Sequence, residues 1–113
     1  MKPVIKVLGF PEISEEGLRE IHQNLVKIAV EDRLVMGAGG ISLFFFPDNR
    51  SYGVGGDIVI EMTRLPLFYS KGGLHTLAKD FGTSVLKMFP AASSVEVSAE
   101  SVSGYKIYWS SAD

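Results

Sequence analysis

Two cations stand where they could hold an acidic ligand, and they are the first candidates for chemistry in this sequence. Arg64 ends a strand-like segment, and its planar guanidinium suits the fork-shaped recognition of a carboxylate. Lys71 lies at the start of a predicted helix, where the helix dipole disfavours a positive charge. Its presence there hints at a use. For both residues the alternative is a solvated charge without a functional role.

Most other kinds of site are absent from the sequence. The chain has no cysteine, which excludes disulfide frameworks, thiolate metal sites and thiol nucleophiles. His22 and His75 lie in predicted helices without a ligand-type partner three or four residues away, so we expect no metal site. The glycine-rich segment 53–56 is not followed by a helix, which argues against a dinucleotide or phosphate site. We therefore expect no cofactor.

Length and charge narrow the class of protein further. The 113 residues suffice for one domain, and 46% hydrophobic with 21% charged residues is typical of a globular chain. The formal net charge of −2 lacks the basic excess of a general nucleic-acid binder. Neither a signal-peptide pattern nor a stretch of 18 apolar residues occurs, so we expect no membrane span. A cytoplasmic location is the default expectation.

The first half of the chain is predicted to be strand, helix, strand. Residues 3–8 are β-rich, and Ser14 is placed to cap a helix that ends near Asp32 or Arg33. Apolar residues follow that cap at helical spacing: Leu18, Ile21, Leu25 and Ile28. Residues 41–46 form a short, almost wholly apolar strand, which is typical of a strand covered on both faces.

The second half repeats this order. Residues 57–64 alternate as a strand, and Ser70 is placed to cap a second helix that Pro90 terminates. Gly82 should weaken that helix slightly. Residues 95–100 alternate as a fourth strand, and a short fifth strand covers residues 105–109.

The two halves keep register, which indicates an internal duplication. Pro3 corresponds to Asp57 and Ile41 to Val95, so pseudo-repeats cover about 1–54 and 55–113 of a single domain, 1–113. The predicted fold class is α+β: two β-α-β units form a four-stranded mixed sheet with both helices on one face, plus a short C-terminal strand. The other face would then be uncovered, and another copy of the chain is the expected partner.

This order resembles the tautomerase superfamily, the fold of macrophage migration inhibitory factor and oxalocrotonate tautomerase. The resemblance covers nearly the whole chain. It rests on the opening Pro3-Val-Ile-Lys-Val, on 41–48 followed by Tyr52-Gly-Val-Gly-Gly, and on Val95-Glu-Val with the aromatic tail to Trp109. The resemblance implies a homotrimer whose sheets wrap a central channel.

The resemblance also implies a chemistry. In the family, an N-terminal proline in an apolar pocket is a secondary amine that acts as general base on a small enol or keto acid. Here Met1 and Lys2 precede Pro3, so its nitrogen belongs to an amide and has no basicity. Pro3 is therefore either a structural residue at a strand start or, if the first two residues are removed, the catalytic base. For the chain as written we expect little or no proline-dependent activity.

By the same resemblance, a ligand pocket is expected at the N-terminal end of the first strand. Pro3 and Arg64 would form it with a C-terminal aromatic residue, Tyr105 or Trp109, from the same or a neighbouring subunit. Lys71 mirrors, through the internal repeat, a basic position in the family's first helix. Arg33 and Arg50 lie in loops that border the pocket in family members, although each is also explained as a solvated charge.

Three functional hypotheses remain open at this point. The protein is a tautomerase-like isomerase of a small carboxylate, or a non-catalytic trimer of the same fold that binds a small acid or a protein. The third possibility is a ferredoxin-like domain that senses a metabolite. The mature N-terminus separates the first two hypotheses, whereas strand order and oligomeric state separate the third.

Overall fold

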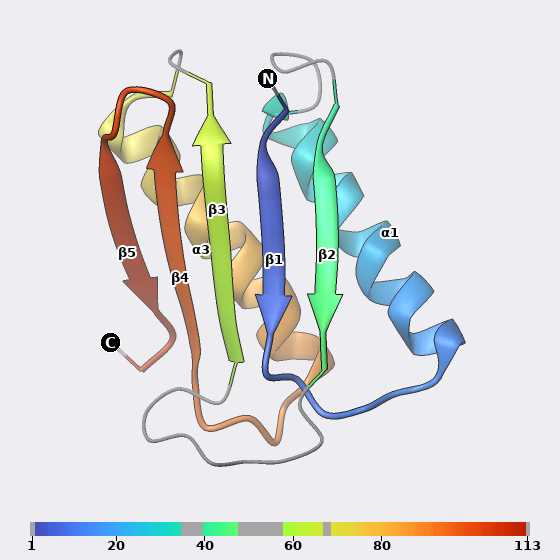
Figure 1. The fold of residues 1–113 in the computed structure, drawn as a ribbon. Helices are drawn as coiled ribbons and strands as arrows, with labels where there is room; N and C mark the ends of the chain where they lie inside the picture. The colour runs from blue at the N-terminus through green and yellow to red at the C-terminus, as the bar shows by residue number, and fades with distance from the viewer. Residues whose placement is uncertain (1, 35–39, 48–57, 67–68, 113) are drawn as a thin grey trace.

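One mixed sheet of five strands, with two helices on one of its faces, makes up the described part of the chain (Figure 1). The computed structural model describes residues 2–34, 40–47, 58–66 and 69–112. Its strands are β1 (Val4–Leu8), β2 (Ser42–Phe46), β3 (Ile58–Leu65), β4 (Val95–Ser101) and β5 (Lys106–Ser110). Its helices are α1 (Glu15–Glu31) and α3 (Lys71–Met88). The predicted α+β class and element order are confirmed.

Both helices begin at the serine caps that the sequence predicts. The Ser14 hydroxyl accepts a hydrogen bond from the Gly17 amide at 3.1 Å, and the Ser70 hydroxyl accepts one from the Gly73 amide at 3.0 Å. Each bond satisfies an amide that has no partner within the helix. Asp32 is the C-cap residue of α1, as expected, and α3 ends two residues before Pro90.

The sheet order is β2-β1-β3-β4-β5. Within each half the two strands joined by a helix are parallel neighbours, β1 with β2 and β3 with β4. The halves meet through the antiparallel pair of β1 and β3 at the centre, and β5 adds an antiparallel edge beside β4. In a ferredoxin-like sheet a strand of the other half would separate the two strands of each unit. This order therefore rules out the ferredoxin-like hypothesis.

The core lies between the sheet and the two helices. Strand residues of alternating positions face the helices, and the buried stripes of α1 and α3 pack against them. Its largest fully buried side chains include Phe10, Phe81, Ile5, Ile21, Leu25, Ile60, Met62 and Leu77. Phe10 also contacts Phe45 edge-on, with ring centroids 6.3 Å apart.

The opposite face of the sheet is uncovered in the single chain, and we refer to it as the open face. Phe44 and Phe46 of the edge strand β2 point to it; each is 47% exposed, and their rings stack with centroids 6.5 Å apart. Tyr108 of β5 is 70% exposed. The two-sided burial predicted for 41–46 is therefore not achieved within one chain.

The glycine that the sequence marks as a weak point of α3 has a packing role instead. A Cβ atom at Gly82 would lie 2.2 Å from Cζ3 of Trp109 and 3.0 Å from a methyl group of Val97. The indole ring therefore lies directly against the helix backbone. Only a residue without a side chain permits this approach of β5 to α3.

Several residues named in the sequence predictions fall outside the described residues: Arg50, Tyr52, the segment 53–56 and Asp57. Neither of the two described helices is long and apolar enough to cross a membrane.

Candidate functional site

The antiparallel pairing of the two central strands brings Pro3 next to the end of β3. Val4 pairs with Thr63 in this ladder, so Pro3, one residue earlier, lies beside Arg64. Pro3 is buried, and its carbonyl accepts a hydrogen bond from the Ser42 amide at 2.9 Å. Neighbouring strands lie about 4.8 Å apart. Pro3 and Arg64 are therefore the residues that directly follow the last pair of this ladder on their two strands.

Arg64 lies at an irregular point of β3. The register between β3 and β4 shifts between Met62 and Leu65, and Arg64 has φ 61°, in the left-handed region. That conformation costs a residue with a side chain roughly 1–2 kcal/mol. As a result, Met62 and Leu65 are both buried while Arg64 is exposed. The irregularity turns the guanidinium side chain away from the core at the position beside Pro3, as bulges next to binding sites do.

The same end of the molecule carries two more predicted site residues. Tyr105 precedes β5; its amide donates to the Ser101 hydroxyl at 3.2 Å, and Ser101 pairs with Leu65 of β3. Lys71 is the first residue of α3, and the start of α3 also lies at this end, behind the sheet in Figure 1. Both side chains are exposed. We call the end of the sheet that holds Pro3, Arg64 and Tyr105 the Pro3 edge.

The single chain does not bring every candidate together. Tyr105 is three strands across from Pro3, a distance of about 14 Å at the usual strand spacing. Trp109 pairs with Val97, which is aligned through β3 with Val7, four residues or about 13 Å along β1 from Pro3. It also packs on the helix side of the sheet, against Gly82. Of the candidate site residues that the structure describes, only Arg64 lies next to Pro3 in one chain.

One cation at this edge escaped the sequence analysis. The side chain of Lys2 lies over Gly40, where an added Cβ would come within 3.6 Å of Lys2 Cε. Gly40 has φ 129°, a conformation that suits only glycine. Lys2 therefore adds a positive charge next to Pro3. A lysine that directly precedes Pro3 could have been noticed as a charge, but its contact with Gly40 depends on the β1–β2 pairing.

Chemically, this edge can hold an anion but offers no proline base. Arg64 and Lys2 are exposed cations, and a guanidinium binds a carboxylate through two parallel hydrogen bonds. The lone pair of the Pro3 nitrogen is delocalised into the Lys2 carbonyl, so it cannot accept a proton near neutral pH. Cleavage before Pro3 would create a secondary amine at the end of β1, next to the end of β3 that carries Arg64.

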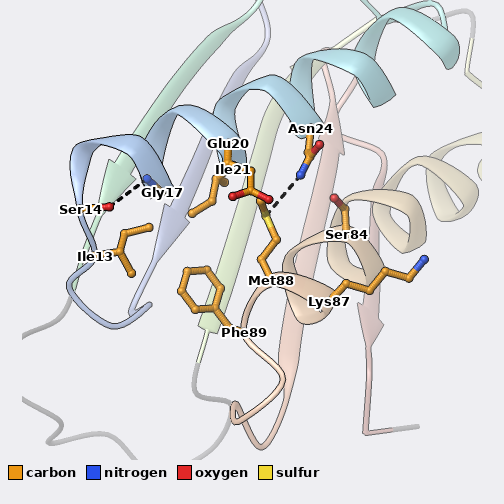
Figure 2. A pocket seen from close by; sticks show the side chains of 10 residues that line it. All are labelled: Ile13, Ser14, Gly17, Glu20, Ile21, Asn24, Ser84, Lys87, Met88 and Phe89. Atoms are coloured by element: carbon orange, nitrogen blue, oxygen red, sulfur yellow. Dashed lines mark hydrogen bonds between the residues drawn. The ribbon is translucent and has the colours of Figure 1, made fainter.

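Two hollows of the surface lie away from the Pro3 edge. The larger, about 840 Å³, is a groove between the first half of α1 and the C-terminal end of α3 (Figure 2). Its floor is apolar, with Ile21, Met88 and Phe89, and Glu20 and Lys87 stand on opposite rims. The Asn24 amide contacts the Met88 sulfur at 3.8 Å within it. Pro3, Arg64 and Lys71 do not line this groove.

The second hollow, about 450 Å³, lies on the open face over β3, β4 and β5. Glu61, Lys106 and Tyr108 are among its lining residues. The Lys106 ammonium is 5.2 Å from the centre of the Tyr108 ring, and a hydrogen bond with Tyr108 raises the pKa of Lys106 above its ordinary value. Within the described ranges, no group of three histidine or acidic side chains could hold a metal ion.

Comparison with known proteins identifies the fold. No family model matches the sequence, and no curated protein sequence matches it. Among solved structures, a 5-carboxymethyl-2-hydroxymuconate isomerase from Deinococcus radiodurans R1 superposes with a TM-score of 0.60 at 12% identity, over 79% of this chain and 70% of that one. Leishmania major MIF2 superposes with a TM-score of 0.57 at 9% identity, over 77% of this chain and 76% of that one.

Both of these structures belong to the tautomerase superfamily. At such low identities the likeness concerns the arrangement of helices and strands. The chain accordingly has a divergent tautomerase-like fold, as its sequence predicted.

Proposed function

We propose that this protein is a homotrimeric, tautomerase-like protein that binds a small enol or keto carboxylate at the Pro3 edge. The observation that carries the proposal is Arg64: an exposed arginine beside Pro3, in a backbone conformation that is unfavourable for any residue with a side chain. Recognition of an anion would explain why an arginine is kept at this strained position, since the strain turns its guanidinium group outward. The structural neighbours, one of which is a muconate isomerase by name, agree with a carboxylate ligand.

The trimer is supported by the open face. Phe44 and Phe46 on the edge strand β2, and Tyr108 on the opposite edge strand β5, are large hydrophobic side chains that a single chain leaves exposed on the sheet. Exposed apolar surface such as the stacked pair of Phe44 and Phe46 often marks an interface. A neighbouring copy would also supply Tyr105, an exposed aromatic side chain that is too far from Pro3 within one chain. Trp109 does not suit this role, because its ring packs against Gly82 on the helix side of its own sheet. Sedimentation at micromolar concentration should give a mass of about three chains; a mass of one chain would contradict this part of the proposal.

Isomerisation is the activity proposed for the form in which Pro3 is N-terminal. In that form the proline nitrogen would move the proton between carbons while Arg64 holds the carboxylate. The alternative is a non-catalytic binding module, and the observation that favours it is the peptide bond between Lys2 and Pro3 in the chain as written.

Ketonisation of phenylenolpyruvate tests these alternatives. The 113-residue chain should be inactive, and protein that starts at Pro3 should turn over, with Pro3→Ala in the shortened form as control. Activity of the full chain that survives Pro3→Ala would show that another base is at work. Inactivity of both forms would leave the binding module.

Ligand binding is measured separately from turnover. Loss of a charged hydrogen bond costs about 1.5–3 kcal/mol, so Arg64→Ala should weaken the binding of a simple enol-acid analogue by roughly 10- to 150-fold. Arg19→Ala removes an exposed cation on α1 and is the matched control. Equal affinity of the Arg64→Ala variant and the parent would remove Arg64 from the site.

A further inference from the structure

The groove between α1 and α3 has an apolar floor that the core holds in place. Ile21 is buried in the core, and the ring of Phe89 packs on that of Phe10 with centroids 5.8 Å apart. Met88 is half-buried, with its sulfur 3.8 Å from the Asn24 amide nitrogen. The groove therefore exists without a ligand, and its volume of about 840 Å³ lies in the usual range of small-molecule sites, about 300–1,000 Å³.

The charges around this floor favour a cation. Figure 2 shows the Glu20 carboxylate pointing from α1 across the groove, whereas the ammonium end of Lys87 points away from α1. Glu16 is also exposed and lies one turn before Glu20 on the same side of α1. The Gly17 amide, which could attract an anion at this helix start, already donates to the Ser14 hydroxyl at 3.1 Å. The groove thus offers a carboxylate rather than a donor for an anion.

The lining groups themselves also suit a cation on an apolar body. Met88 contributes a polarisable thioether sulfur, and Phe89 contributes an aromatic ring, whose face attracts positive charge. The Asn24 amide donates to the Met88 sulfur, and a thioether is a weak acceptor. A ligand can therefore replace this bond at little cost, and it gains an amide that can both donate and accept.

We propose that the groove between α1 and α3 binds a small organic amine in its ammonium form. The apolar body of the ligand packs on Ile21, Met88 and Phe89, and its ammonium group donates to the Glu20 carboxylate and to the amide oxygen of Asn24. This site is separate from the Pro3 edge and does not depend on the function proposed there. The groove lies in the helix layer, so a subunit interface on the open face, across the sheet, does not cover it.

NMR titration of the full chain with three probes that share one apolar body tests the proposal. 4-Phenylbutylamine carries a cation, 4-phenylbutanol is neutral, and 4-phenylbutyrate carries an anion. The amine should bind with a Kd of about 1–5 mM, as expected for so small a ligand. It should bind about two- to fivefold more tightly than the alcohol, the range for an exposed ion pair, and the butyrate should bind most weakly. The signals that shift should be the Met88 methyl group and the amides of 17–24 and 84–89.

A single exposed side chain then separates recognition of the cation from simple apolar binding. Glu20→Gln should abolish the preference for the amine and leave the affinity for the alcohol unchanged. Glu31→Gln removes an equally exposed acid about 16 Å further along α1 and should keep the preference. Equal affinities for the three probes in the wild type, or a preference that survives Glu20→Gln, would overturn the proposal. So would the absence of a saturable shift with the amine, or shifts at 2–4 and 63–65 in place of the groove.

Discussion

Replacing Gly82 by alanine should destabilise the protein, although the same change favours most helices. An alanine in a helix interior is about 1 kcal/mol more favourable than a glycine. Here the added Cβ would lie 2.2 Å from Cζ3 and 2.6 Å from Cε3 of Trp109. Carbon atoms in contact are normally 3.5–4.0 Å apart, so the indole ring must move by more than about 1 Å.

The size of the effect follows from the two opposing contributions. Forcing a group into a well-packed core costs about 1–3 kcal/mol, and the gain in helix propensity offsets part of it. We expect the free energy of unfolding to fall by about 1 kcal/mol, measured by urea denaturation at one fixed protein concentration because assembly contributes to stability. Trp109 is the chain's one tryptophan, so its fluorescence emission should shift to longer wavelength as the ring is displaced.

Two control variants make the reasoning refutable. Gly72→Ala adds the same atom in the first turn of α3, where the nearest heavy atom is the Ser70 hydroxyl at 4.0 Å, and it should be neutral or stabilising by up to about 1 kcal/mol. In a Trp109→Val background the closest contact is gone and a Val97 methyl group at 3.0 Å is the nearest remaining atom, so Gly82→Ala should lose most of its destabilising effect. An unchanged unfolding free energy and unchanged emission for Gly82→Ala would show that Trp109 does not pack on this glycine.

Three further predictions follow from single features of the structure. Arg64→Gly should raise the free energy of unfolding by about 1 kcal/mol, since glycine adopts φ 61° without strain, and it should weaken carboxylate binding. Denaturation measures the first effect and titration calorimetry the second. A loss of stability would contradict the strain argument. Ser70→Ala should cost about 1 kcal/mol through loss of the Gly73 cap, and Ser70→Asp should restore most of it; an unaffected unfolding midpoint for Ser70→Ala would show that the cap contributes nothing. The pKa of Asp32 is raised from 3.8 to about 6 in the folded state, so its contribution to stability is greatest below pH 4 and is lost as pH rises through 6. Asp32→Asn should therefore be more stable than the wild type at pH 7 by about 1–2 kcal/mol once solvent screening is allowed for. If the difference in unfolding free energy between the variant and the wild type were the same at pH 7 and at pH 4, this reasoning would be refuted.

Local patterns in the sequence determined the elements and their faces. Ser14 and Ser70 could be recognised as caps because an N-cap bond spans only three residues. The alternation of Ile58, Ile60 and Met62 identified the buried face of β3, because side chains of a strand alternate between the two faces. The repeat of strand, helix and strand was enough to predict two parallel pairs with their helices on one side.

The neighbours across the sheet and between the layers were decided only by the tertiary structure. Periodicity says which way a side chain points but not which distant residue it meets, and a contact between residues such as Gly82 and Trp109 leaves no local signal. The nearness of Pro3 and Arg64 was suggested by a family resemblance, and no spacing in the chain implied it; it arises because β1 and β3 pair antiparallel at the centre. The left-handed conformation of Arg64 and the hydrogen bond from the Tyr69 hydroxyl to the Asp32 carbonyl, between residues 37 positions apart, likewise required the packed fold. Long-range pairing sets these features, since each depends on two segments that are brought together only when the whole sheet and both helices are in place.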